Sequence, residues 1–194
     1  MVIDATGAPP APDMTVLIAG DRIASVSKSA GVAVPAGART VDASGKFLIP
    51  GLWDMHAHPF LLPTVAADVL LDAYLANGVT SLRDPAGPLD AQIQARAAQT
   101  TGARPGPRLS VSGPLLDGPV PLWPRMAIPV GTASEARRAV SALTRAGVDF
   151  VKVYDFLPRP AYLAIVDEAK RRRVPVAGHV PIASRRRKRR APAR

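Results

Sequence analysis

The chain has 194 residues, of which 47% are hydrophobic, and a formal net charge of +10 at pH 7. This length and composition suit a globular protein with a buried core, and the absence of cysteine excludes disulfides, thiolate metal sites and a cysteine nucleophile. Residues 185–194 carry six arginines and one lysine, so the other 184 residues hold only +3 of the net charge and form a mildly basic body.

The first residues do not resemble a secretion signal. Residues 1–13 contain two aspartates and three prolines, where a signal peptide has a basic start and an apolar stretch. No apolar window is long enough to span a membrane. We therefore expect a cytoplasmic protein with no membrane partner, although the strand-like opening MVIDATG leaves open a missing upstream segment that held a signal.

Residues 1–49 are predicted to form part of a small β-sandwich. Two short apolar runs flank Gly20-Asp21, and glycine followed by aspartate is typical of a two-residue hairpin loop. A second pair of strands, RTVDA and KFLIP, is predicted around Ser44-Gly45. We expect this sheet to be incomplete at its N-terminal edge.

After residue 50 the pattern changes to strands that alternate with helices. Apolar residues at helical spacing predict four helices, and short apolar runs predict the strands between them. The predicted helices begin near residues 67, 89, 133 and 160, and the predicted strands are KFLIPGLW, VTSLRD, RLSVSG, VDFVKVYDF and VPVAGHVP. Residues 114–129, which are rich in proline, are interpreted as a long loop, and Thr132 with Glu135 matches a capping box.

This alternation predicts an α/β fold with parallel strands and crossover helices. A closed (β/α)8 barrel and an open doubly wound sheet both fit the pattern. A complete barrel takes about 250 residues, whereas the alternating part covers residues 47–181, room for about five of eight units. We predict a partial TIM-type (β/α)8 barrel over 50–183, preceded by the partial sandwich and followed by a basic, disordered tail over 184–194.

Two histidines, His56 and His58, follow the first of these strands in the stretch DMHAHPF. Side chains alternate along a strand, so residues two apart point to the same side, and barrel ligand sites lie at the carboxyl ends of the strands. Neutral imidazole binds zinc and similar divalent ions. The pair therefore predicts part of a metal site, with an incidental His-x-His pair as the alternative.

A lysine and a third histidine lie on later strands. Lys152 has apolar neighbours, and burial lowers the pKa of a lysine, so that its neutral amine can react with carbon dioxide to give a metal-bridging carbamate. His179 ends the following strand. The alternatives are a lysine whose ammonium reaches solvent at the strand end and a histidine that supports a site or lies on the surface.

These stretches together resemble one family of enzymes. FLIPGLWDMHAHP, GVTSLRD, DFVKVYDF and VPVAGHVP are similar to the amidohydrolase superfamily, in its branch of imidazolonepropionase-like and prolidase-like metal-dependent hydrolases. The resemblance covers residues 2–182 and implies a barrel that packs against a β-sandwich built from both chain ends. It also implies hydrolysis of a C–N bond in a small-molecule amide, lactam or dipeptide by a metal-activated water.

The resemblance also implies roles for individual residues. His56 and His58 would bind the more buried of two divalent ions, which are expected to be zinc. Lys152, as a carbamate, would bridge both ions, and His179 would bind the second. Tyr154, on the same strand face as Lys152, is a candidate substrate contact.

Arg83 and Asp84 end the second barrel strand. They are interpreted either as residues that shape the pocket or as a surface ion pair at a loop, and the ion pair is the favoured interpretation.

The sequence departs from the superfamily pattern after His179. The family has another metal-binding histidine on the sixth strand and a catalytic aspartate on the eighth, but no histidine or aspartate follows His179, so no catalytic residue is assigned. We therefore expect a truncated fragment with little or no activity that binds one metal ion or none. The tail SRRRKRRAPAR is interpreted as the result of a frameshift or truncation, with a purposeful tail as the alternative.

Two further functions stay open. The terminal arginines can bind nucleic acid or another anionic surface by counterion release, although the body contains no recognisable nucleic-acid module, so a small-molecule substrate is the expected partner. The second alternative is an open α/β protein that binds no metal.

Overall fold

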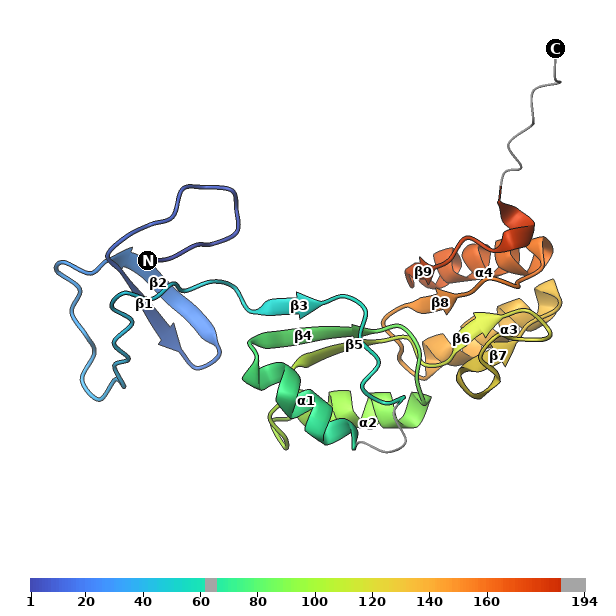
Figure 1. Ribbon diagram of the computed structural model, residues 1–194, viewed down its shortest axis with the longest axis horizontal. Coiled ribbons are helices and arrows are strands. Elements are labelled where there is room, and N and C mark those ends of the chain that lie inside the picture. The colour runs from blue at the N-terminus through green and yellow to red at the C-terminus, as the bar shows by residue number, and fades with distance from the viewer. Residues whose placement is uncertain (62–65, 186–194) are drawn as a thin grey trace, which may run out of the picture. The chain divides into compact units, whose positions relative to one another are not determined.

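The structure is a computed structural model that describes residues 1–61 and 66–185 (Figure 1). The chain divides into two compact units, Met1–Gly51 and Leu52–Arg194. Residues 186–194, which make up most of the expected basic tail, lie outside the described residues. Within the described part, no helix has the length and hydropathy needed to cross a membrane.

The N-terminal unit contains the first predicted hairpin. Strands β1 (Met14–Ala19) and β2 (Arg22–Lys28) pair antiparallel around Gly20, whose φ of +62° a glycine adopts without steric cost. The register shifts between Leu17 and Ile18, which marks a bulge in β1. The hairpin prediction from the dipeptide GD is therefore confirmed.

The second predicted hairpin is wrong. Residues 39–50, all of which the structure describes, form no strand pair, and Leu48 makes only an isolated bridge to Val2. The turn at Ser44-Gly45 is present, but Val41 and Phe47 on either side of it are 74% and 65% exposed. The turn alone is therefore not enough to produce a strand pair here.

The second unit begins with a parallel three-stranded sheet in the order β3-β4-β5, formed by Leu52–Asp54, Val79–Asp84 and Arg108–Val111. Helices α1 (Ala67–Ala76) and α2 (Leu89–Thr100) cover one face of this sheet (Figure 1). Leu71 of α1, Leu82 of β4 and Val111 of β5 meet in a buried cluster. The strand–helix–strand order and parallel pairing match the predicted α/β alternation.

A second parallel sheet has the order β7-β6-β8-β9, formed by Ala127–Pro129, Leu115–Asp117, Val151–Val153 and Val176–Gly178. Helices α3 (Ala133–Arg145) and α4 (Arg159–Arg172) pack against each other, and the single turns η1 (Pro124–Met126) and η2 (Ile182–Ser184) complete the described elements. Val140 of α3, Ile165 of α4 and Val153 of β8 belong to the core.

The predicted loop over 114–129 is wrong in part, because it contains β6 and β7. Leu115 and Leu116 are buried, and β6 pairs on one side with β7 and on the other with β8. Strands β6 and β7 have three residues each, which is too short to show a periodic pattern in the sequence. They form strands because of their position in the fold, not because of the intrinsic preferences of their residues.

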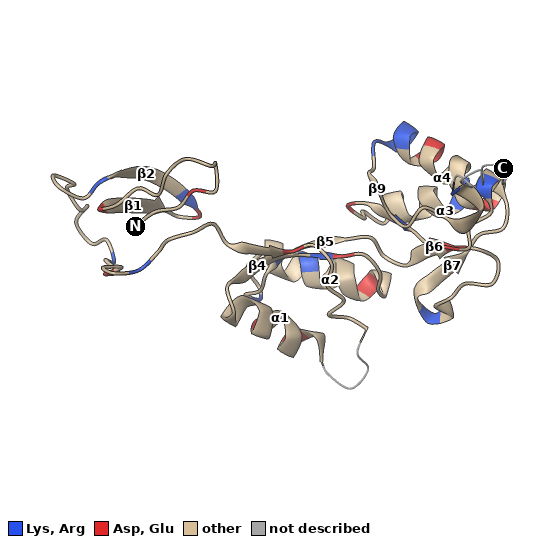
Figure 2. Cartoon of the chain, turned by 45° about the horizontal axis from the view of Figure 1, so that its top comes forward, with Lys and Arg blue, Asp and Glu red and all other residues tan. Residues whose placement is uncertain are grey.

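Charged side chains stabilise the start of α3 and the end of α4. The capping box of Thr132 and Glu135 at the start of α3 is confirmed, with both reciprocal hydrogen bonds present. At the end of α4, the buried carboxylate of Glu168 pairs with Arg171 and Arg172. Figure 2 shows that α4 carries both acidic and basic residues. Basic residues in the last turn of a helix interact favourably with the negative end of the helix dipole.

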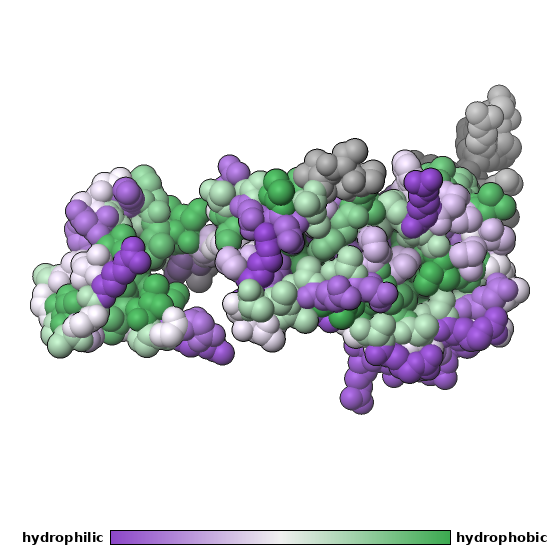
Figure 3. Space-filling view, turned by 90° about the horizontal axis from the view of Figure 1, so that it is seen from below, coloured by the Kyte–Doolittle hydropathy of each residue, from purple (hydrophilic) through white to green (hydrophobic). Residues whose placement is uncertain are grey.

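The fold is thus an α/β arrangement of parallel strands and crossover helices that forms part of a (β/α)8 barrel. Figure 3 shows that hydrophobic side chains also reach the surface of the N-terminal unit, where Ile18 and Ile23 of the hairpin are 64% and 67% exposed.

Candidate metal site at the carboxyl ends of the strands

One cavity of about 410 Å³ brings together the residues that the sequence singles out. Its lining residues come from the ends of several strands: His56, His58, Leu61, Pro85, Ala86, Leu115, Trp123, Met126, Lys152, Tyr154 and His179. The four proposed ligands come from three separate parts of the chain and face a shared space, and so does Tyr154.

The two paired histidines lie in the turn that follows β3. Because β3 ends at Asp54, strand alternation does not by itself orient His56 and His58. Their rings nevertheless approach edge to face, with centroids 5.0 Å apart. The backbone N–H of His56 donates to the Asp54 carboxylate over 2.9 Å, and this contact fixes the turn that carries both rings.

A buried carboxylate orients His58. Its Nδ1 lies 3.1 Å from Oδ1 of Asp84 and 3.2 Å from the carbonyl oxygen of Ala86. Asp84 is fully buried. In the tautomer that donates its Nδ1–H to these acceptors, Nε2 carries no proton and can bind a ligand. This carboxylate–histidine pairing is the usual support of a metal-binding histidine.

His179 has the same kind of partner. Its Nδ1 lies 3.0 Å from Oδ2 of Asp155, and its ring stacks on that of Tyr154 at a centroid distance of 4.3 Å. Asp155 also accepts a hydrogen bond from Arg185 over 2.8 Å. His179 is thus held on two sides, again with Nε2 as its remaining nitrogen.

Lys152 lies in the middle of β8 and is only 5% exposed, which does not favour the interpretation that its ammonium reaches solvent at the strand end. Burial and the nearby charge of Arg83 lower the pKa of Lys152, while Asp155 opposes the shift. Burial also lowers the pKa of His56, with further contributions from Lys152 and His58. Both shifts favour the neutral forms, which are the forms that bind metal or react with carbon dioxide.

The surface ion pair between Arg83 and Asp84 is wrong as well. Arg83 donates its Nε–H to the carbonyl oxygen of Met55 over 2.7 Å, while Asp84 points inward to His58. The two side chains alternate to opposite faces at the end of β4, as neighbours on a strand do. Asp84 does not itself line the cavity and acts on the candidate site through its contact with His58.

Asp155, Trp123 and Met126 are among the residues around the cavity that were not predicted from the sequence. Asp155 directly follows Tyr154 at the end of the lysine strand, and this position is the only signal that could have identified it. Trp123 and Met126 lie in the stretch interpreted as a loop, where no periodic pattern marks a lining residue.

The side chains around the cavity differ from a ready-made metal site in one respect. Among the residues that the structure describes, no group of three or more histidine, cysteine, aspartate or glutamate side chains is arranged to hold an ion. A carbamate on Lys152 would add the anionic oxygen donors that three imidazoles lack. The donor types present would suit a divalent ion only with a further anionic donor of this kind.

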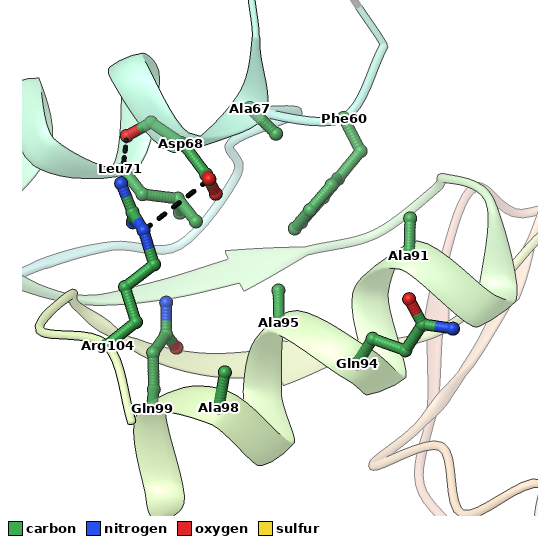
Figure 4. A pocket seen from close by; sticks show the side chains of 10 residues that line it. All are labelled: Phe60, Ala67, Asp68, Leu71, Ala91, Gln94, Ala95, Ala98, Gln99 and Arg104. Atoms are coloured by element: carbon green, nitrogen blue, oxygen red, sulfur yellow. Dashed lines mark hydrogen bonds and ion pairs between the residues drawn. The ribbon is translucent and has the colours of Figure 1, made fainter. Parts of the chain in front are cut away.

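A second cavity, of about 380 Å³, lies between α1 and α2 and contains none of the proposed ligands (Figure 4). Arg104 at its edge pairs with Asp68 and Asp72, and small alanine side chains from both helices line it. This cavity lies away from the strand ends, so it is not the candidate site.

Parallel strands, crossover helices and a histidine-and-lysine cavity at the carboxyl ends of the strands define an amidohydrolase-type barrel protein. Comparison with solved structures agrees. A protein from Bifidobacterium longum assigned as a prolidase is 28% identical at a TM-score of 0.78, covering 88% of this chain and 45% of that one. A bottromycin amidohydrolase is 29% identical at a TM-score of 0.75, covering 94% of this chain and 38% of that one.

Other comparisons point to the same group. A prolidase complexed with N-methylphosphonate-L-proline is 25% identical at a TM-score of 0.71, covering 86% of this chain and 51% of that one. A dihydroorotase from Trichlorobacter lovleyi is 64% identical over 28 residues, which are 14% of this chain and 7% of that protein. No family model matches the chain.

The chain belongs to the amidohydrolase superfamily. It spans about half the length, or less, of these three solved structures, and its match to the dihydroorotase covers under a tenth of that protein.

Proposed function

We propose that this chain carries the metal-binding part of a hydrolase site that cleaves C–N bonds of small amides, lactams or dipeptides. The observation that carries this proposal is the pair of carboxylate-held histidines, His58 and His179, facing the same cavity as Lys152. The relatives with hydrolytic activities support the reaction class. Superfamily members generally use divalent metals, which supports the cofactor.

The protein's contribution is to hold the ligands in their reactive forms. His56 and His58 would bind one ion through neutral imidazoles, and His179 would bind a second through Nε2. A bound divalent ion supplies Lewis acidity, which lowers the pKa of a bound water and polarises a carbonyl group. Zinc is the expected metal, although imidazole and carbamate donors also suit manganese, cobalt or iron.

Lys152 has the surroundings that a carbamate needs. Its lowered pKa increases the fraction of neutral amine. The lone pair of this amine would form an N–C bond to carbon dioxide as one C=O π bond opens to a carboxylate oxygen, and the nitrogen would release a proton to solvent. The product is an anion in place of a cation. This change removes the repulsion that an ammonium would exert on metal ions beside it and provides oxygens that can bridge two ions.

The substrate is expected to be a small molecule that enters the cavity near Tyr154. The phenol group lies beside His179, and its ring is 5.9 Å from Nζ of Lys152. A substrate that reaches the metal ligands would pass this side chain, so Tyr154 is our candidate substrate contact. The ligand of the prolidase structure, a proline derivative, supports a substrate of this size.

Zinc titration by calorimetry tests the proposal on the full chain. Wild-type protein, kept in bicarbonate, is expected to bind zinc, and both His58→Ala and Lys152→Met are expected to weaken binding by about tenfold or more because each removes a donor. Lys170→Met, which removes an exposed lysine of α4, is the matched control and should leave binding unchanged. Equal affinities in all four proteins would contradict the site and favour an α/β protein that binds no metal.

Binding to nucleic acid or an anionic surface through the terminal arginines is the alternative function. Only Arg185 of this run is described, and it bonds to Asp155 and to the carbonyl oxygen of Val180. The first arginine of the run therefore has partners within its own unit, which does not favour the alternative over a hydrolase.

A further inference from the structure

A third carboxylate, Asp117, lies at the carboxyl end of β6, and the proposed metal site does not use it. Asp117 is fully buried. Its Oδ1 accepts a hydrogen bond from the backbone N–H of Phe156 over 2.7 Å, and its Oδ2 accepts one from the backbone N–H of Leu122 over 3.0 Å. One side chain thus links two segments that are separated by more than thirty residues of sequence.

Both linked segments carry side chains of the candidate site. Leu122 directly precedes Trp123, and Phe156 follows Tyr154 by two residues. The indole Nε1–H of Trp123 donates to the Tyr154 hydroxyl over 3.2 Å, and both side chains line the cavity. Asp117 therefore holds the backbone on each side of the Trp123–Tyr154 hydrogen bond.

The chain around Asp117 also approaches Phe156 closely. A Cβ at Gly118 would overlap the carbonyl oxygen of Phe156, so only glycine fits there. The carbonyl oxygen of Asp117 accepts from the N–H of Val130 over 2.8 Å. These contacts hold both ends of the segment 118–130, which carries Trp123 and Met126.

We propose that Asp117 is a positioning residue that fixes Trp123 against Tyr154 and so builds the aromatic side wall of the cavity. The wall consists of the aromatic rings of Trp123 and Tyr154 together with the side chain of Met126. Trp123 is 50% exposed, so part of its ring is open to a ligand, and the wall presents an apolar surface beside the ligand-bearing strands. A role of this wall in selecting substrates rests on the proposed hydrolase function. The positioning of the wall by Asp117 does not depend on that function.

The chemistry of the contact requires a carboxylate. Each oxygen of Asp117 accepts from a different backbone N–H, Oδ1 from Phe156 and Oδ2 from Leu122. An asparagine offers one carbonyl oxygen, and its amide N–H group would face the second backbone donor. Asp117→Asn therefore keeps the size of the side chain but leaves one of the two backbone N–H groups without its acceptor.

Tryptophan fluorescence measures the position of the wall without metal or substrate. In a Trp53→Phe background, Trp123 is the only tryptophan, and Asp117→Asn is expected to increase its quenching by acrylamide toward that of free indole. The matched control is Asp149→Asn, because Asp149 also accepts from a backbone N–H, that of Val111, but lies away from the wall. Unchanged quenching in Asp117→Asn, or an equal increase in Asp149→Asn, would overturn the proposal.

Hydrogen exchange of the wild-type protein keeps the proposal testable if Asp117→Asn does not fold. The amides of Leu122 and Phe156 lie outside the strands, yet both should be protected like those of β8. Where the variant folds, the Leu122 amide should exchange about 10- to 100-fold faster, because a hydrogen bond to a charged acceptor is lost. An unprotected Leu122 amide in the wild-type protein would overturn the proposal, whether or not the chain binds zinc.

Discussion

At the scale of single residues, carboxylates organise the candidate site. Asp84 and Asp155 each hold the Nδ1 side of one histidine, which leaves Nε2 of His58 and of His179 for a ligand. Asp84 is fully buried, and its Oδ2 has no hydrogen-bond partner among the described residues. Because a buried carboxylate is costly without partners, its bond to His58 is an important part of what stabilises it there.

Replacing Asp84 tests this support. Asp84→Asn keeps the shape of the side chain but removes the charge that favours the Nδ1–H form of His58. We expect zinc affinity, measured by competition with a chromophoric chelator, to fall about 10- to 100-fold. Asp72→Asn makes the same charge change on the exposed face of α1, and its affinity should equal that of wild type. A wild-type affinity for Asp84→Asn would show that His58 is not a ligand held in this way.

At the scale of elements, burial decides which short segments become strands. Strand β6 has only three residues, but Leu116 is fully buried in the core, and the strand pairs on both edges. Leu116→Ala should therefore lower the free energy of unfolding by about 2–5 kcal/mol, because it leaves a cavity in the packed core.

Urea unfolding gives this measurement, with Leu163→Ala as the control. Leu163 lies on α4 and is 48% exposed, so its truncation should change stability by no more than about 0.5 kcal/mol. A similar small loss for both variants would mean that β6 is a loop, as the sequence pattern indicates.

The start of α3 gives a pH dependence. Backbone N–H groups of Gly131 and Thr132 donate to Glu135 and lower its pKa below the ordinary value of 4.5. A lowered pKa in the folded state means that this stabilisation is present above pH 4.5 and is lost as the pH falls through the folded pKa. The thermal midpoint of wild type should therefore exceed that of Glu135→Gln above pH 4.5, and the difference should shrink in acid.

The control for this experiment is Asp90→Asn in the first turn of α2, a helix that begins without a side-chain cap. This variant removes a carboxylate from a first helical turn that has no capping box, so it separates the effect of the capping box from that of losing one acid. A Glu135→Gln difference that stays constant across the acid range would show that the capping box does not depend on the ionised carboxylate.

At the scale of the whole molecule, the two units bury different amounts of their apolar surface. The barrel unit holds both buried clusters, whereas hairpin residues of Met1–Gly51 such as Ile18 and Ile23 stay exposed. Hydrogen exchange followed by mass spectrometry should therefore show fast exchange in β1 and β2 and slow exchange in β4 and β8. Equal protection in the two units would contradict this difference in local stability.

Particular residues show which features can be predicted from the sequence. The hairpin at Gly20, the capping box at Thr132 and the four helices could be predicted, because each depends on interactions between residues close in the chain. The proposed ligands could be named as candidates, because His56 and His179 follow predicted strands and Lys152 has apolar neighbours within one. Strand β6 could not be predicted, because it depends on which apolar side chains are buried in the core. The second predicted hairpin does not form although its turn is present.

The sequence by itself determined the class of fold, the superfamily and the residue types of the candidate site, since periodicity and short motifs are local properties. Only the tertiary structure decided that Asp84 turns inward to His58, that Asp155 supports His179, and that Asp117 joins the segments of Trp123 and Tyr154. The physical reason is that these hydrogen bonds join segments 24 or more residues apart, except for Asp117 with Leu122, and depend on how strands align side by side. Local patterns do not contain that alignment, and parallel pairing with crossover helices creates it.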